Sequence, residues 1–165
     1  MHIAYLKNYQ EWIPRIAKWF RDEWREIQPM TLQDIKARLC ERVNTKTLPL
    51  ALVAVEGNKV VGTVSLIKNE SKKLSKYTPI ITSLFIRKKY RNKELGAMLV
   101  KAITSKAKRM GVGRVYVYLI NKNHVAFYEK LGWRPVKEVV KYKKEQVLTP
   151  LYVLMKNLRT TKGSV

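Results

Sequence analysis

The stretch Ser83-Leu-Phe-Ile-Arg-Lys-Lys-Tyr-Arg-Asn-Lys-Glu-Leu-Gly-Ala-Met-Leu-Val100 passes from an apolar run, through a basic segment, into a helical pattern. The run over Pro79–Ile86 is apolar almost throughout, which predicts a central strand. From Leu95 to Met110, apolar residues recur at spacings of three and four, which predicts a helix that starts at about Glu94 or Leu95. Val115–Ile120 is a further apolar run. The region therefore predicts a strand–helix–strand crossover whose two strands are parallel.

The start of this predicted helix has the properties of an anion-binding site. A helix N-terminus leaves up to four N–H groups unpaired and carries about half a positive charge. Gly96 and Ala97 have almost no side chain, so a ligand can approach their backbone closely. Five cations precede them: Arg87, Lys88, Lys89, Arg91 and Lys93. The segment is either a cradle for a pyrophosphate or a basic loop that is merely solvated.

The pattern of apolar and polar residues along the rest of the chain predicts an α/β fold in one domain over residues 1–158, with 159–165 as a frayed tail. Strands and helices alternate so as to form a mixed sheet of about seven strands with helices on both faces. Thr31 and Asp34 predict a capped start for the second helix. The remaining predicted helices are Tyr9–Ile27, Leu32–Val43 and His124–Leu131, and the remaining strands are His2–Leu6, Leu50–Val55, Val60–Ile67, Pro135–Lys143 and Val147–Met155.

The charge of the chain is unusual. Its 165 residues include 34 Lys and Arg and 12 Asp and Glu, which gives a net charge of +22. Residues 81–165 hold 20 of the basic and four of the acidic residues, a net +16. Such a field attracts nucleotides, phosphorylated cofactors, nucleic acid or anionic lipid. The alternative is a lysine-rich surface without a specific role, because the lysines form no long block.

The rest of the composition excludes several classes of protein. Cys40 is the only cysteine, which excludes an internal disulfide framework and a multi-cysteine metal site. His2 and His124 are the only histidines, so we expect no metal centre. No apolar run approaches the roughly 18–20 residues of a membrane span, and the N-terminus lacks the layout of a secretory signal. We expect a cytoplasmic protein without a membrane partner.

A second segment, Asn121-Lys-Asn-His-Val-Ala-Phe-Tyr-Glu-Lys-Leu-Gly-Trp133, directly follows the strand after the central helix. Phe127, Leu131 and Trp133 supply apolar packing. Tyr128 carries a hydroxyl that can donate a proton and has an ordinary pKa of about 10. Tyr128 is therefore either a general acid or an amphipathic residue of the core.

Together the two segments resemble the Gcn5-related N-acetyltransferases (GNAT). In that family an Arg/Gln-x-x-Gly-x-Gly/Ala loop opens the central helix, and here it matches at Arg91 and Gly96 but departs at Glu94, where the family prefers glycine. The family's later signature matches at Asn121 and over Phe127–Trp133, with His124 where alanine is usual. The element order agrees over essentially residues 1–158.

The resemblance implies an acetyl-CoA-dependent N-acetyltransferase that moves an acetyl group directly to an amine. It implies that Tyr128 protonates the departing thiolate and that a carboxylate takes the proton of the amine, with Glu23 and Asp22 as the choices. Cys40 matches no family motif, so a covalent acetyl-cysteine route is not expected. The implied cofactor-binding residues are Leu84, Phe85, Ile86, Arg91, Asn92, Lys93, Glu94, Leu95, Gly96, Ala97, Asn121 and Tyr128.

Several points stay open at this stage. The acceptor is a small amine or a protein or peptide amine, and the basic C-terminal half offers a surface for an anionic macromolecule. A monomer and a homodimer are both compatible with the sequence. The alternative from another class is a nucleic-acid- or ribosome-binding module on a degenerate acetyltransferase fold. Its support is the net +16 of residues 81–165 and the departure at Glu94, whose carboxylate would repel a pyrophosphate if it pointed inward.

Overall fold

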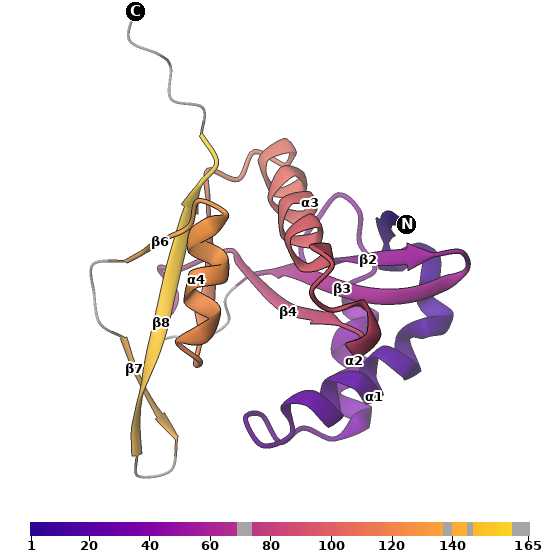
Figure 1. Cartoon of the computed structure of the whole chain (residues 1–165), viewed down its shortest axis with the longest axis horizontal. Coiled ribbons are helices and arrows are strands. Elements are labelled where there is room, and N and C mark those ends of the chain that lie inside the picture. The colour runs from indigo at the N-terminus through magenta and orange to yellow at the C-terminus, as the bar shows by residue number, and fades with distance from the viewer. Residues whose placement is uncertain (69–73, 137–139, 145–146, 160–165) are drawn as a thin grey trace, which may run out of the picture.

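The computed structural model describes residues 1–68, 74–136, 140–144 and 147–159 (Figure 1). Its elements, in chain order, are β1 (His2–Tyr5), η1 (Leu6–Trp12), α1 (Ile13–Trp24), α2 (Leu32–Glu41), β2 (Leu50–Glu56), β3 (Lys59–Ile67), β4 (Ile80–Ile86), η3 (Lys88–Tyr90), α3 (Leu95–Arg109), β5 (Arg114–Leu119), α4 (Asn123–Lys130), β6 (Arg134–Pro135), β7 (Val140–Lys144) and β8 (Val147–Asn157).

The strands form one mixed sheet in the order β1-β2-β3-β4-β5-β8-β6, with β7 paired to β8. As predicted, β4 and β5 are parallel and flank the crossover helix α3, while the other pairs are antiparallel. The α/β prediction is confirmed. The described chain has eight strands rather than about seven, because the strand expected over Pro135–Lys143 divides into β6 and β7. Residues 137–139, between them, lie outside the described residues.

The side chains of β2 point alternately into two hydrophobic cores, one on each face of the sheet. Leu50, Leu52 and Ala54 pack with α3 on one face of the sheet. Ala51 and Val53 pack with α1 and α2 on the other face. Figure 1 shows this arrangement, with α3 on one side of β2–β4 and α1 and α2 on the opposite side. Because successive side chains of a strand point to opposite faces, a strand that is apolar throughout can serve both layers.

A bulge in β4 changes which residues face α1 and α2. Thr63 of β3 pairs with Phe85, but Ser65 pairs with Thr82, so β4 has one extra residue between these points. Ser83 lies in this bulge and has a positive φ of 56°. As a result Ile81 packs in the core on the α3 side, whereas Phe85 packs in the core on the α1 and α2 side. In a regular strand, two residues four positions apart would share a face.

Strand β4 pairs with β5 only near the beginning of β4, opposite the middle of β5. Ile80 and Ile81 are the described β4 residues that pair with β5. Farther along β4, the N–H of Arg87 donates to Val61 of β3 at 3.0 Å. Because the peptide groups of successive residues point to opposite edges, the N–H and C=O of Leu84 and Ile86 point away from β3. The second half of β4 therefore has an open backbone edge on the side of β5.

The N-terminal helix starts later than the predicted Tyr9. Residues 6–12 form the 3-10 segment η1, in which Tyr9 has non-helical angles (φ −134°, ψ 34°), and α1 begins at Ile13 with proline in its first turn. The predicted cap of α2 is confirmed, because Thr31 Oγ1 accepts a hydrogen bond from the N–H of Asp34 at 3.1 Å. Of the expected tail 159–165, only Arg159 lies within the described residues. None of the helices in the described ranges has the length and apolarity needed to cross a bilayer.

Candidate active site

The first turn of α3 has free backbone donors. Met98 N–H bonds to Glu94 O at 3.0 Å, which is the first hydrogen bond of the helix. No side chain caps the helix, and within the described part of the chain the N–H groups of Leu95, Gly96 and Ala97 have no hydrogen-bond acceptor. Leu95 is buried, while Gly96 and Ala97 are half-buried. Three N–H groups and the positive end of the helix dipole thus meet at one accessible point, as an anion requires.

The loop before α3 contains two left-handed residues, Asn92 (φ 62°) and Glu94 (φ 59°, ψ 5°). Glu94 thus lacks the negative φ that residues with a side chain usually adopt. L-residues with a side chain reach this conformation at a cost of roughly 1–2 kcal/mol, and glycine reaches it freely. This explains in physical terms why glycine suits the position. Where a left-handed residue adjoins a right-handed helix, successive backbone N–H groups also point toward one side and form a concavity that binds anions.

The two motifs found in the sequence lie side by side. A Cβ built on Gly96 would lie 3.5 Å from Cζ of Phe127, so the start of α3 packs against α4. Asn121 is exposed, and its Oδ1 accepts a hydrogen bond from the N–H of Asn123 at 2.9 Å, which orders the turn that leads into α4. Since α3 follows β4 and α4 follows β5, these motifs flank the opening between the two strands.

Tyr128 is a buried residue of α4 with only 4% of its surface exposed. Its ring makes edge contacts with Phe127 and Trp133, at centroid distances of 5.0 and 5.4 Å. Burial raises the pKa of the Tyr128 hydroxyl well above its ordinary value of 10. No described residue forms a hydrogen bond with the Tyr128 hydroxyl. The Tyr128 hydroxyl is therefore protonated at neutral pH.

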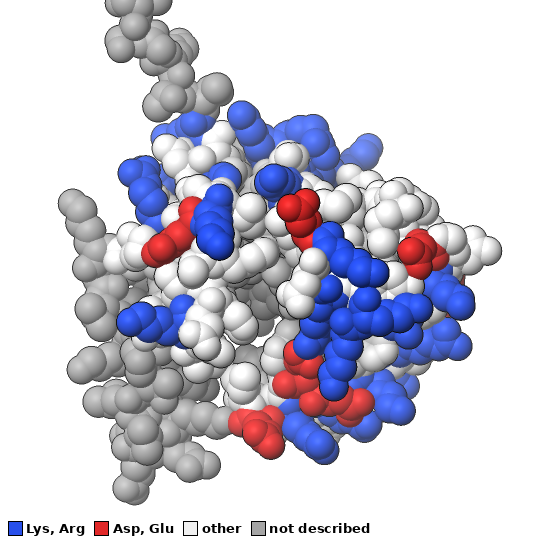
Figure 2. All heavy atoms as spheres, in the orientation of Figure 1, with Lys and Arg blue, Asp and Glu red and all other residues white. Residues whose placement is uncertain are grey.

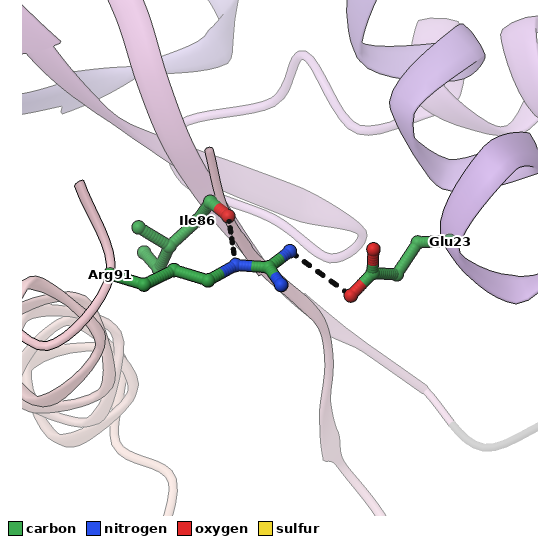
Figure 3. A network of polar contacts seen from close by, with 3 residues as sticks. All are labelled: Glu23, Ile86 and Arg91. Atoms are coloured by element: carbon green, nitrogen blue, oxygen red, sulfur yellow. Dashed lines mark hydrogen bonds and ion pairs between the residues drawn. The ribbon is translucent and has the colours of Figure 1, made fainter. Parts of the chain in front are cut away.

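Arg91 joins the open edge of β4 to α1 (Figure 3). Its Nε donates to the carbonyl of Ile86 at 2.8 Å, and its Nη2 lies 3.0 Å from Oε1 of Glu23. The guanidinium also lies 5.5 Å from the ring centroid of Phe85. The side chain of Arg91 therefore points toward α1. Its guanidinium bridges the carboxylate of Glu23 and the backbone carbonyl of Ile86 in β4. Asp22, the other carboxylate considered, pairs with Arg21 at 3.6 Å.

The five cations of the loop do not all converge on the start of α3. Lys89 and Lys93 lie over the ring of Tyr90, whose hydroxyl donates to Glu56 Oε2 at 2.5 Å. Arg87 lies over the ring of Trp19 at 5.4 Å. Figure 2 shows that Lys and Arg nevertheless gather over the segment between β4 and α3, with acidic side chains beside them over α1. The loop keeps a positive field, although Arg87, Lys89 and Lys93 contact aromatic rings and Arg91 pairs with Glu23.

Sequence reasoning missed the stacking of Phe85 on the tryptophans of α1 and the burial of an arginine. Phe85 stacks on Trp19 at 5.6 Å and makes an edge contact with Trp24 at 6.2 Å, on the α1 side of β4. Arg42, at the end of α2, is only 9% exposed and donates from Nη1 to Ser65 and Ser83. The sequence pattern that could have revealed this burial is the position of Arg42, three residues after Leu39 and therefore on the same face of the helix. In the described ranges, no group of three or more His, Cys, Asp or Glu side chains is arranged to hold a metal ion.

The sequence model of the family described as "Acetyltransferase (GNAT) family" matches residues 13–133 of the chain. The chain belongs to this family. The matched range contains every one of the implied site residues, from Glu23 on α1 to Tyr128 on α4. Both signatures quoted from the sequence lie inside it, so the resemblance stated from residues alone is confirmed.

Known proteins similar to this GNAT member include a plant enzyme and two acetyltransferases of known structure. The L-ornithine N5-acetyltransferase NATA1 of Arabidopsis thaliana is 37% identical over 81 residues, which cover 48% of this chain and 36% of that protein. An aminoglycoside 6'-N-acetyltransferase solved with coenzyme A has a TM-score of 0.73 at 17% identity, covering 98% of this chain and 99% of that chain. The putative acetyltransferase yncA of Salmonella typhimurium, solved with acetyl-CoA, has a TM-score of 0.73 at 16% identity, covering 100% and 98%. At these identities the structures show a shared fold.

Proposed function

We propose that this chain transfers an acetyl group from acetyl-CoA to the nitrogen of an amine. In the reaction an N–C bond forms and the C–S bond of the thioester breaks. An alkyl ammonium, with a pKa of about 10.4, loses one proton before attack and a second as the amide forms. One of these protons leaves to solvent, and the departing sulfur takes up one proton to become the thiol of CoA.

The observation that carries the proposal is the open second half of β4 beside the uncapped start of α3. The N–H groups of Leu95, Gly96 and Ala97 would bind the pyrophosphate, with the cations of the loop adding charge. The backbone of Leu84–Ile86 would pair with the extended arm of the co-substrate along the open edge. Asn121, Asn92 and Lys93 lie in the turns on either side of the opening.

Three groups would serve the chemistry. A backbone N–H of the Leu84–Ile86 stretch would donate to the oxyanion that develops on the thioester oxygen. Tyr128 would protonate the sulfur, and the same desolvation that raises the Tyr128 pKa also raises the pKa of a buried thiol. Glu23 would take the proton of the amine, since Arg91 already holds its carboxylate next to the β4 edge.

Binding of acetyl-CoA is tested directly by thermal unfolding. A ligand that binds the native state raises its free energy of unfolding by RT ln(1 + [L]/Kd), or about 2.7 kcal/mol at 100 times the Kd. We expect millimolar acetyl-CoA to raise the Tm by several degrees, with adenosine giving a smaller rise because it lacks the pyrophosphate. Release of CoA thiol in the presence of an amine panel would then establish transfer.

A protein whose Tm rises with a short RNA duplex but not with acetyl-CoA would contradict the proposal. That result would support the nucleic-acid-binding module on the same fold, which the charge of +22 favours. NATA1 is named as acting on L-ornithine, and we include L-ornithine in the amine panel for that reason.

Replacement of Glu94 by glycine is expected to raise both the apo stability and the affinity for acetyl-CoA. The stability gain, up to about 1 kcal/mol, comes from release of the left-handed strain, because Glu94 lies outside the helical angles and no helix-propensity penalty applies. The affinity gain comes from removal of a negative charge near the phosphates and is about fivefold. Chemical denaturation without ligand measures the first effect, and titration calorimetry measures the second.

Two controls separate these effects. Glu94→Gln removes the charge and keeps the backbone strain, so it should raise the affinity alone. Asn92→Gly relieves a left-handed residue that has no charge, so it should raise the stability alone, and by less, because asparagine tolerates this conformation. A drop in affinity in Glu94→Gly would mean that Glu94 holds the loop in its binding shape.

A further inference from the structure

The first strand of the chain lies at one end of the sheet. β1 pairs with β2 in a register that runs from His2 opposite Val55 to Tyr5 opposite Leu52. The strand order ends at β1, so within the described chain its other edge pairs with no strand. Because the N–H and C=O groups of successive residues point to opposite edges, about half of the backbone groups of β1 point toward this unpaired edge.

This edge lacks most of the features that protect an edge strand from pairing with another chain. Charged side chains, prolines and bulges usually give that protection. The four residues His2-Ile-Ala-Tyr5 include no lysine, acidic residue or proline, and their register with β2 contains no bulge. β1 can therefore accept one more strand of about four residues, which is a length of roughly 13 Å.

An open groove of about 300 Å³ lies between β1 and the second half of α3. Ile3 and Tyr5 form part of its floor, because both pack on the face of the sheet that α3 covers. The residues of α3 that line its wall are Ala102, Ser105, Lys106 and Arg109. Since the sheet ends at β1, none of the described strands closes the outer side of the groove. Alternate side chains of a strand added to β1 would point into this space.

The wall of the groove is positively charged. Lys106 Nζ lies 5.4 Å from the ring centroid of Tyr5, so its ammonium lies above the floor. Arg109, three residues farther along α3, is exposed. Neither cation forms an ion pair or hydrogen bond within the described ranges. No acidic residue lines the groove, and α3 carries four basic residues and no acidic one. The groove therefore attracts a negatively charged ligand.

An acidic peptide fits this groove better than the other candidates. A peptide backbone has the N–H and C=O groups that pair with the open edge of β1, and its side chains can contact an apolar floor. The sugar–phosphate backbone of a nucleic acid has no such regular pairing with a strand. A second copy of this chain would bring a net charge of +22 to a basic groove.

We propose that an extended acidic segment of a partner protein binds here as an additional strand on β1, with its carboxylates facing Lys106 and Arg109. In this mode the main-chain hydrogen bonds provide affinity and alternate side chains provide specificity. Acidic residues at every second position of the segment would all face α3. Because β2 and β3 separate β1 from β4, docking leaves the opening between β4 and β5 free.

Fluorescence anisotropy with a labelled peptide tests the proposal. The probe is a six-residue peptide with blocked ends, in which glutamate and valine alternate. We expect saturable binding to the full chain. Two control peptides should bind at least tenfold more weakly. One has lysine in place of glutamate, which reverses the charge, and the other is N-methylated at every residue, which removes the N–H groups that would donate to β1.

Charge-reversal variants locate the binding site. Lys106→Glu and Arg109→Glu should each weaken binding of the Glu–Val peptide about fivefold or more. Lys108→Glu is the matched control, because it lies in the same turn of α3 and changes the net charge equally but does not line the groove. It should change the Kd by less than about twofold. Bound peptide should also slow hydrogen exchange of the amides in residues 2–5, and the Tm of each variant checks its folding.

Each alternative occupant gives a distinct result that overturns the proposal. Equal binding of the N-methylated peptide, or unchanged hydrogen exchange in β1, would exclude strand addition. An effect of Lys108→Glu as large as that of Arg109→Glu would show attraction to net charge alone. A single-stranded oligonucleotide that binds tenfold more tightly than the peptide would favour a nucleic acid. A chain that sediments as a dimer, and as a monomer after Lys106→Glu, would favour a second copy.

Discussion

Replacement of Tyr128 by phenylalanine is expected to lower kcat by about 10²- to 10⁴-fold, the usual contribution of a general acid. The change removes only the hydroxyl, and the ring keeps its edge contacts with Phe127 and Trp133. The Kd for acetyl-CoA should therefore stay within about twofold of the wild-type value. Steady-state thiol release and calorimetry give the two numbers. Tyr116→Phe, in a buried ring pair with Tyr77 on another part of the sheet, is the matched control for loss of a tyrosine hydroxyl.

The raised pKa of Tyr128 leads to a separate prediction, about the stability of the protein at alkaline pH. Since burial holds the folded-state pKa above the unfolded value of about 10, the unfolded chain loses this proton first as the pH rises. The contribution of Tyr128 to stability is therefore complete below pH 10 and is lost as the pH rises above it. Tyr128→Phe should lose less stability than the wild type between pH 8 and pH 10.5 in urea unfolding. A variant with wild-type kcat would show that another group protonates the sulfur.

The second large effect is expected for Glu23→Gln. The amide oxygen can still accept the hydrogen bond from Arg91, so the contact to the β4 edge is kept while the base is lost. We expect kcat/KM for the amine to fall about 10²-fold or more near pH 7. The deficit should shrink as the pH approaches about 10.4, because the amine then loses its proton without help. The pH profile of wild type and variant measures both effects.

Asp22→Asn is the matched control for Glu23→Gln. Asp22 is the neighbouring carboxylate of α1, and its partner is Arg21 rather than the arginine that contacts β4. We expect its kcat/KM to equal that of the wild type at every pH. If the two variants behaved in reverse, the base would be Asp22, and the Arg91–Glu23 pair would be a structural link between the loop and α1.

Most of the element order could be predicted from the sequence because it depends on local patterns. The periodicity of three and four over α3, the turn between β2 and β3, and the cap at Thr31 each involve residues close together in the chain. The crossover between β4 and β5 followed from the same patterns together with the handedness rule for parallel strands. The two signatures were readable for the same reason, since each spans one turn and one helix start.

Contacts between distant segments could not be predicted from local patterns. The linear motif does not reveal that Arg91 contacts the carbonyl of Ile86 and the carboxylate of Glu23. The motif also does not reveal that Glu94, which joins the loop to α3, has left-handed backbone angles. Both outcomes depend on how α1, β4 and α3 pack together.

The sequence alone thus determined the class of fold, the family and the two segments that flank the opening between β4 and β5, because periodicity and short motifs are local. Only the tertiary structure decided the bulge at Ser83, the burial of Arg42 beneath β4 and the pairing of Arg91 with Glu23. A bulge inverts the faces of every later residue in its strand, and whether it forms is decided by packing on both sides of the sheet. For that reason the contacts of Arg42 with Ser65 and Ser83 could not be predicted from the sequence around these residues.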